Sequence, residues 1–95
     1  MDRQKLIDEF LSGFKPKKDQ SWKSCYFFAH SLKKKYDIAV QLKEGISRIN
    51  KADYWVVSFD NIDEDIHAKA MGETLDFIDK PDVIWSLEEF EKDNF

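Results

Sequence analysis

Hydrophobic residues near the start of the chain recur at three- and four-residue spacing, the period of an amphipathic α-helix. The apolar positions that share one helical face are Leu6, Ile7, Phe10, Leu11 and Phe14. Asp2 can cap the N-terminus of such a helix, and Gly13 can close it. We therefore expect a helix from residue 3 to residue 11 or 12.

The same period returns after a loop that contains Pro16. The apolar positions of this second stretch are Trp22, Cys25, Tyr26, Ala29, Leu32 and Tyr36. Asp19 or Ser21 is a suitable N-cap, and the lysines at 33–35 fall in the last turn, where cations favour the helix dipole. The pattern predicts a helix over residues 20–35.

The period then changes to two, which is typical of a half-buried strand. Residues 38–43 alternate in this way, residues 43–45 are expected to turn, and residues 46–49 are a weaker candidate strand. Residues 54–59 are aromatic or β-branched on both faces, which predicts an internal strand.

The last third of the chain is less regular. Residues 60–65 are expected to be an acidic connection, residues 66–78 are compatible with either a helix or a strand, and residues 80–82 are expected to interrupt the chain before a short strand at 83–85. Ser86 and Glu89 fit a capping box, with Trp85 and Phe90 spaced as a hydrophobic staple. A short acidic helix is predicted from residue 87 to about 92.

Helices followed by strands favour a segregated α+β fold over alternating βαβ units. We expect one domain over residues 1–95, with two N-terminal helices packed on a small, mainly antiparallel sheet of three to four strands and a short C-terminal helix. Fourteen aromatic residues supply enough apolar surface for a compact core.

Composition excludes several classes of function. No apolar run is long enough to span a membrane, and the charged residues 1–9 do not resemble a secretory signal. A single cysteine, Cys25, and two histidines cannot form a Cys/His zinc site, and no glycine-rich phosphate motif is present. We expect a cytoplasmic protein without cofactor, metal or catalytic residues, in which Cys25 is a core residue.

Charge is divided unevenly along the chain. Residues 1–52 hold 12 Lys/Arg and 6 Asp/Glu, whereas residues 53–95 hold 3 and 13. If the later acidic side chains converge, they form a negative face that steers a basic protein, with two tryptophans as aromatic anchors. The candidate partner-binding residues are Asp60, Asp63, Glu64, Asp65, Trp55, Trp85, Glu88, Glu89 and Glu91.

Three other kinds of site are compatible with parts of the sequence or can be tested against it: nucleic-acid binding, metal binding and nucleophilic catalysis. Lys15, Lys17, Lys18 and Lys23 surround Trp22 and precede Tyr26, Phe27 and Phe28, a basic and aromatic segment that could bind nucleic acid. Asp63 and His67 are four residues apart, a spacing compatible with a metal. Cys25 and His30 lack an orienting third group for nucleophilic catalysis.

Small size, acidity and the lack of a catalytic constellation favour a non-enzymatic inhibitor of a basic protein. The expected type is an immunity protein or antitoxin that neutralises a nuclease toxin, or a phage inhibitor of a host nuclease. The alternative is a nucleic-acid-binding regulator that uses residues 15–23.

Overall fold

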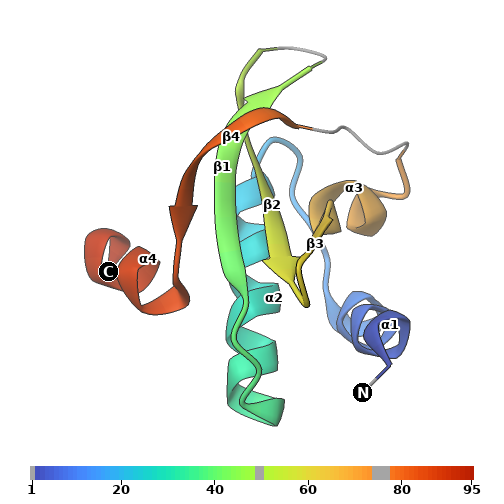
Figure 1. The fold of residues 1–95 in the computed structure, drawn as a ribbon. Coiled ribbons are helices and arrows are strands. Elements are labelled where there is room, and N and C mark those ends of the chain that lie inside the picture. Colours follow the sequence, from blue (N-terminus) through green and yellow to red (C-terminus); the bar gives the residue numbers. More distant parts are fainter. Residues whose placement is uncertain (1, 49–50, 74–77) are drawn as a thin grey trace.

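A computed structural model describes residues 2–48, 51–73 and 78–95. In chain order the elements are α1 (Arg3–Gly13), α2 (Ser21–Tyr36), β1 (Gln41–Ser47), β2 (Asp53–Phe59), β3 (Ile62–Glu64), α3 (Ile66–Met71), β4 (Ile78–Trp85) and α4 (Leu87–Asn94). The predicted α+β class is confirmed, with two N-terminal helices, a four-stranded antiparallel sheet and a short C-terminal helix (Figure 1).

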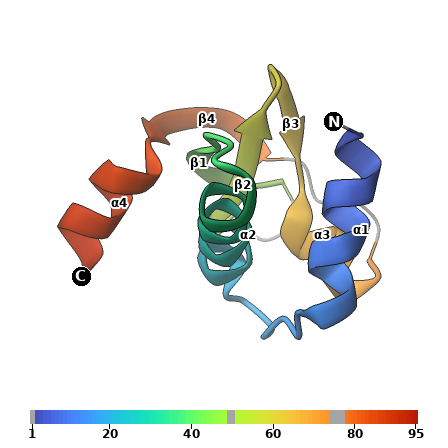
Figure 2. The ribbon, with the colours of Figure 1, turned by 90° about the horizontal axis from the view of Figure 1, so that it is seen from below.

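The strands lie in the order β3-β2-β1-β4, and each neighbouring pair is antiparallel. β2 is therefore an internal strand, as its apolar faces predicted. Helix α2 lies behind the sheet, α1 and α3 lie beside β3, and α4 lies at the opposite flank (Figures 1 and 2). The two flanks of the sheet therefore carry different helices.

The core fills the space between α2 and the sheet. Phe28 of α2 is fully buried and meets the ring of Phe10 on α1 at 5.2 Å and that of Phe59 on β2 at 5.5 Å. Leu42 and Val57 pair across β1 and β2, and both are fully buried. Burial of these side chains is the main favourable term that holds the two layers together.

The helix ends follow the sequence signals only in part. Asp2 caps α1 by accepting from the backbone N–H of Gln4 and Lys5, as predicted. Neither expected cap of α2 is used, because the N-cap is Gln20 and makes no side-chain bond. The Ser21 hydroxyl instead accepts from the backbone N–H of Trp55 at 3.0 Å. A tertiary contact thus takes the group that was expected to cap the helix.

The first strand differs from the prediction at both ends. It begins at Gln41 rather than residue 38, because Asp37 turns the chain with φ 56° and Ile38 donates back to the Leu32 carbonyl at 3.3 Å. The expected turn at 43–45 is wrong, since Gly45 lies within β1 and pairs with Tyr54. A register shift against β4 between Glu44 and Ile46 disturbs the period-two pattern there. Of the candidate strand at 46–49, positions 46 and 47 end β1, and 49 lies outside the described residues.

The last third contains more regular structure than predicted. β3 lies inside the expected acidic connection, and residues 66–71 form a helix, which settles the first part of the open segment 66–78. Residues 74–77 of that segment lie outside the described residues. The expected break at 80–82 does not end the strand, because β4 runs through these positions, but its register against β1 shifts there, between Val83 and Asp79. Proline is tolerated at a sheet edge, where its missing N–H breaks no ladder bond, and β4 is an edge strand.

The C-terminal helix follows its local signal. The Ser86 hydroxyl accepts from the Glu89 N–H, and the Glu89 carboxylate accepts from the Ser86 N–H, both at 3.1 Å. The rings of Trp85 and Phe90 lie 6.3 Å apart, which confirms the staple contact. Residues within one helical turn fix this start, and so the sequence alone located it.

Candidate functional site

The nine candidate partner-binding residues do not form a single face. Asp60 lies in the β2–β3 turn, Asp63 and Glu64 lie on β3, and Asp65 is the N-cap of α3. Glu88, Glu89 and Glu91 lie on α4. These two groups occupy opposite flanks of the sheet (Figure 2). The sequence left open whether the acidic residues share one face, and in the structure the two groups form separate surfaces.

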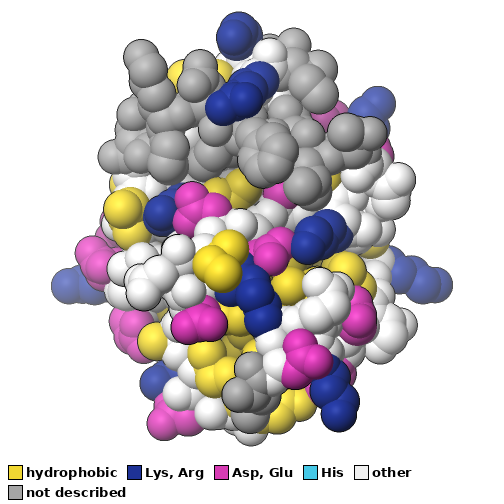
Figure 3. Space-filling view, turned by 45° about the vertical axis from the view of Figure 1, so that its right-hand side comes forward, with side chains coloured by type: hydrophobic (Ala, Val, Ile, Leu, Met, Phe, Trp, Pro, Cys, Tyr) yellow, Lys and Arg dark blue, Asp and Glu magenta, His cyan; other side chains and the backbone are white. Residues whose placement is uncertain are grey.

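Basic side chains neutralise much of the β3 flank. Glu64 forms ion pairs with Arg3 at 3.0 Å and with Lys69 at 2.7 Å, and Asp63 pairs with Lys43 at 2.9 Å. Partial burial raises the pKa of Glu64, but the hydrogen bonds from Lys69 and Arg3 outweigh it, so that the net pKa is lowered. Figure 3 shows basic and acidic side chains interspersed over the face that it displays. These charges cancel locally.

Asp65, one of the predicted partner-binding residues, has a structural role at the start of α3. Its side chain accepts from the Ala68 N–H at 3.0 Å, which caps α3, and from the Tyr54 hydroxyl at 2.6 Å. The residue is only 4% exposed. Little of this carboxylate is therefore left at the surface for contact with a partner. Asp60 stays exposed at the turn before β3.

The α4 flank keeps its negative charge at the surface. We call Glu88, Glu89, Glu91, Asp93 and Phe95 the α4 surface. Glu88, Glu89 and Asp93 are exposed, and Glu91 is half-buried and accepts from the Tyr26 hydroxyl at 2.9 Å. Leu87 and Phe90 are buried and hold the helix against the body of the protein. This arrangement presents the carboxylates on a fixed support.

The predicted aromatic anchors lie beside this helix. Trp55 and Trp85 are half-buried, with ring centroids 6.5 Å apart, and both contact Phe90. Two relevant residues were missed at the level of sequence. Phe90 joins the tryptophans to α4, and Phe95 is 73% exposed at the end of that helix. The staple spacing pointed to Phe90, whereas no pattern pointed to Phe95.

Most aromatic residues of the alternative nucleic-acid segment serve packing. Phe28 is fully buried, and the half-buried Trp22 and Tyr26 both contact the Phe90 ring. Lys23 lies over the Trp22 ring at 5.6 Å. Stacking on bases requires ring faces that solvent can reach. Among the four aromatic residues Trp22, Tyr26, Phe27 and Phe28, only Phe27 is exposed.

A serine–histidine pair lies in the interior. The Ser24 hydroxyl and His67 Nδ1 are 2.8 Å apart, a distance suited to a nucleophile and its base. Ser24 is fully buried and His67 is 6% exposed, so that a substrate has no access to the pair. Burial lowers the pKa of His67, and the nearby carboxylates of Asp65, Glu73 and Asp19 oppose this effect without reversing it. The pair is a satisfied polar contact within the core.

The other chemical candidates are also separated by the fold. Asp63 pairs with Lys43, while His67 faces Ser24, so the two possible metal ligands do not meet. Within residues 2–48, 51–73 and 78–95, no group of three His, Cys, Asp or Glu side chains is arranged to hold a metal. Cys25 is fully buried, and burial raises the pKa of its thiol. Among the helices described, none has the length and hydropathy to cross a bilayer.

The buried histidine predicts a pH-dependent stability. The unfolded chain binds a proton at His67 near the ordinary pKa of 6.5, whereas the folded protein binds it only at lower pH. The free energy of unfolding should therefore be constant above about pH 6.5 and fall as the pH decreases towards 5. Urea unfolding across this range measures the effect. The fall should be smaller in His67→Asn, whose amide can keep the bond to Ser24; identical profiles would contradict this role of His67.

Comparisons of the chain with models of protein families, with curated proteins and with solved structures found no match.

Proposed function

We propose that the protein is a non-enzymatic inhibitor that binds a basic, nuclease-type protein, in the manner of an immunity protein or antitoxin. The observation that supports this most strongly is the α4 surface, where exposed carboxylates are held on an anchored helix next to an exposed aromatic ring. Carboxylates steer a cationic partner during the encounter. The aromatic residues Phe95 and Trp85 supply the apolar contact area that the carboxylates cannot provide.

The recognition surface proposed here contains fewer residues than the one predicted from the sequence. Asp63, Glu64 and Asp65 are removed from the recognition surface because they are paired or buried. The single cysteine, Cys25, is free, which is compatible with a reducing compartment, and we propose that the protein acts in the cytoplasm. An enzyme is disfavoured because the one nucleophile–base pair that we find in the described residues is enclosed.

Two charge-neutralised double variants test the proposal. Glu88→Gln with Asp93→Asn removes two exposed charges from α4, and Asp8→Asn with Asp60→Asn removes the same number from the opposite flank. Asn suits the positive φ of 55° at Asp60, so the control should fold normally. Both avoid Glu89, whose loss would open the capping box.

Each variant and the wild type are used to capture proteins from a lysate, and the captured partner is then purified for stopped-flow measurements. We expect a Lys/Arg-rich nuclease whose association at low salt slows about tenfold with the α4 variant and is unchanged with the control. We also expect wild-type protein to inhibit its nuclease activity. The proposal is overturned if no basic protein is retained, or if both variants behave alike.

A further inference from the structure

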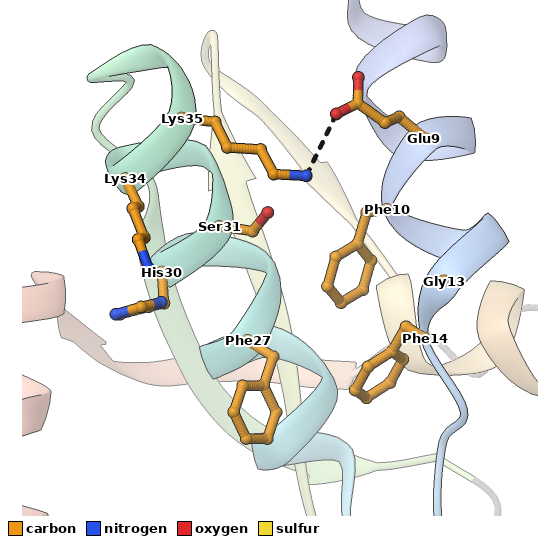
Figure 4. Close-up of a pocket in the computed structure, with 9 residues that line it drawn as sticks. All are labelled: Glu9, Phe10, Gly13, Phe14, Phe27, His30, Ser31, Lys34 and Lys35. Carbon is orange, nitrogen blue, oxygen red and sulfur yellow. Dashed lines mark hydrogen bonds and ion pairs between the residues drawn. The ribbon is translucent and has the colours of Figure 1, made fainter.

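A groove with an aromatic floor lies between α1 and α2 (Figure 4). Helix α1 lies on the side of α2 away from α4 (Figure 2). Its volume is about 440 Å³, within the roughly 300–1,000 Å³ of ordinary ligand sites. Figure 4 shows Phe10 on α1 and Phe14, directly after α1, projecting towards α2, with Phe27 extending from α2 at the Phe14 end of the floor. None of these groups belongs to the α4 surface.

The floor is continuous with the core but remains open to solvent. The Phe10 and Phe14 rings stack at 4.8 Å, and Phe14 and Phe27 are 6.1 Å apart. Phe10 also touches the buried Phe28, which fixes its position. Phe27 is 46% exposed. Adjoining apolar rings left at a surface mark an interaction site more often than a single exposed ring does.

The rim of the groove has an excess of positive charge. Glu9 on the α1 side accepts from the Tyr36 hydroxyl at 2.7 Å and from Lys35 at 3.3 Å. These two bonds lower the pKa of Glu9, which stays ionised and paired. Lys34 also lines the groove and forms no ion pair with any residue that the structure describes. Lys34 can therefore form an ion pair with a carboxylate of a bound molecule.

We propose that this groove binds a helical segment of another protein that presents large apolar side chains flanked by Asp or Glu. Two helices form its walls, an arrangement in which an amphipathic helix can place anchors from successive turns on the apolar floor. An acidic residue of the bound segment pairs with Lys34 at the rim. A nucleic-acid strand fits less well, because its bases would need flat accessible rings rather than a concave floor.

Gly13 provides a steric test that should not disturb the fold. It lies in the wall of the groove, and a Cβ built at this position has no atom within 4 Å. A larger residue also favours the helical backbone more than glycine does. Gly13→Phe should therefore fill part of the groove while the melting temperature stays the same or rises.

The experiment selects binders from a displayed library of random 16-residue peptides. Wild-type protein is the target, and Gly13→Phe is used for counter-selection. The expected result is enrichment of sequences with two apolar residues three or four positions apart and with neighbouring Asp or Glu. If nothing is enriched, or if enriched peptides lack acidic residues, the proposal is overturned.

One enriched peptide is then labelled and titrated in fluorescence anisotropy. Lys34→Glu and Gly13→Phe should each weaken its binding at least tenfold, whereas Lys17→Glu, a matched charge change in the loop before α2, should change it less than twofold. A single-stranded oligonucleotide that competes with the peptide and loses affinity in Lys34→Glu would assign the groove to nucleic acid and overturn the proposal. The Glu88→Gln, Asp93→Asn variant should bind the peptide as the wild type does. The experiment therefore tests the groove independently of the α4 surface.

Discussion

Replacing Phe90 by alanine is expected to lower the free energy of unfolding by about 3–5 kcal/mol, the usual cost of removing a buried phenylalanine. Phe90 is 2% exposed and forms the centre of an aromatic cluster. Its ring lies 5.4–6.3 Å from five other aromatic rings: Trp22, Tyr26, Trp55, Trp85 and Phe95. The cavity left by alanine would separate α4 from both α2 and the sheet, so all three elements lose packing together.

Phe95→Ala is a matched control for this substitution. It removes the same side chain five positions later, where the ring is 73% exposed, and should cost about 0.5 kcal/mol or less. Unfolding in urea can be followed by tryptophan fluorescence, because all three tryptophans contact Phe90. If Phe90→Ala and Phe95→Ala cost the same, Phe90 does not anchor α4.

This result bears on the proposed function as well as on stability. The α4 carboxylates act as a unit only while Leu87 and Phe90 hold the helix in place. In a variant whose α4 is detached, charge still attracts a basic partner, but the bound complex loses its fixed aromatic contacts. We therefore expect Phe90→Ala to accelerate dissociation more than it slows association, the reverse of the charge variants.

Elements with local signals could be predicted from the sequence. The capping box at Ser86 places both partners within one turn, and the apolar faces of residues 54–59 indicated an internal strand. Residues 43–45 and 80–82 were misjudged because Gly45 and Pro81 favour turns in isolation. Pairing with Tyr54 overrides that preference at Gly45, while β4 continues past Pro81 with a shift of register against β1. Contacts with neighbouring strands have no local signature.

The acidic site was predicted less well, for a similar reason. Asp65 precedes a short helix, and its N-cap role was a local signal that could have been recognised. The neutralisation of Glu64 could not, because Arg3 is 61 residues away in the chain. Charge counted along a sequence says nothing of which residues meet in space. The groove was not predicted either, since Phe14 follows α1 whereas Phe27 lies on α2.

Replacing Arg3 by alanine is the second large effect that we expect, a loss of about 2–3 kcal/mol. The guanidinium donates to Glu64 at 3.0 Å, to the Phe59 carbonyl at 2.6 Å and to the Ile62 carbonyl at 2.9 Å. It also lies over the Phe59 ring at 3.9 Å. Its loss leaves these acceptors poorly satisfied in a site where Arg3 and Glu64 side chains are only 18% and 15% exposed.

Two further variants separate charge from geometry at this site. Arg3→Lys keeps the charge but lacks the planar fork, so we expect an intermediate loss of stability. Lys5→Ala removes a cation from an exposed position of the same helix and should cost about 0.5 kcal/mol or less. Chemical unfolding at pH 7 measures the free energy of unfolding of Arg3→Ala, Arg3→Lys and Lys5→Ala. Equal stability of Arg3→Ala and Lys5→Ala would show that Arg3 does not clamp α1 to the β2–β3 hairpin.

The pH dependence gives an independent check on the ion pair. The lowered pKa of Glu64 stabilises the folded protein above the ordinary value of 4.5, and this contribution is lost as the pH falls through the folded pKa. Without Arg3 the pKa of Glu64 should rise, so less stability remains to be lost on acidification. The difference between wild type and Arg3→Ala should therefore shrink below about pH 4. A difference that is constant with pH would assign the effect of Arg3 to its carbonyl bonds and its contact with Phe59 alone.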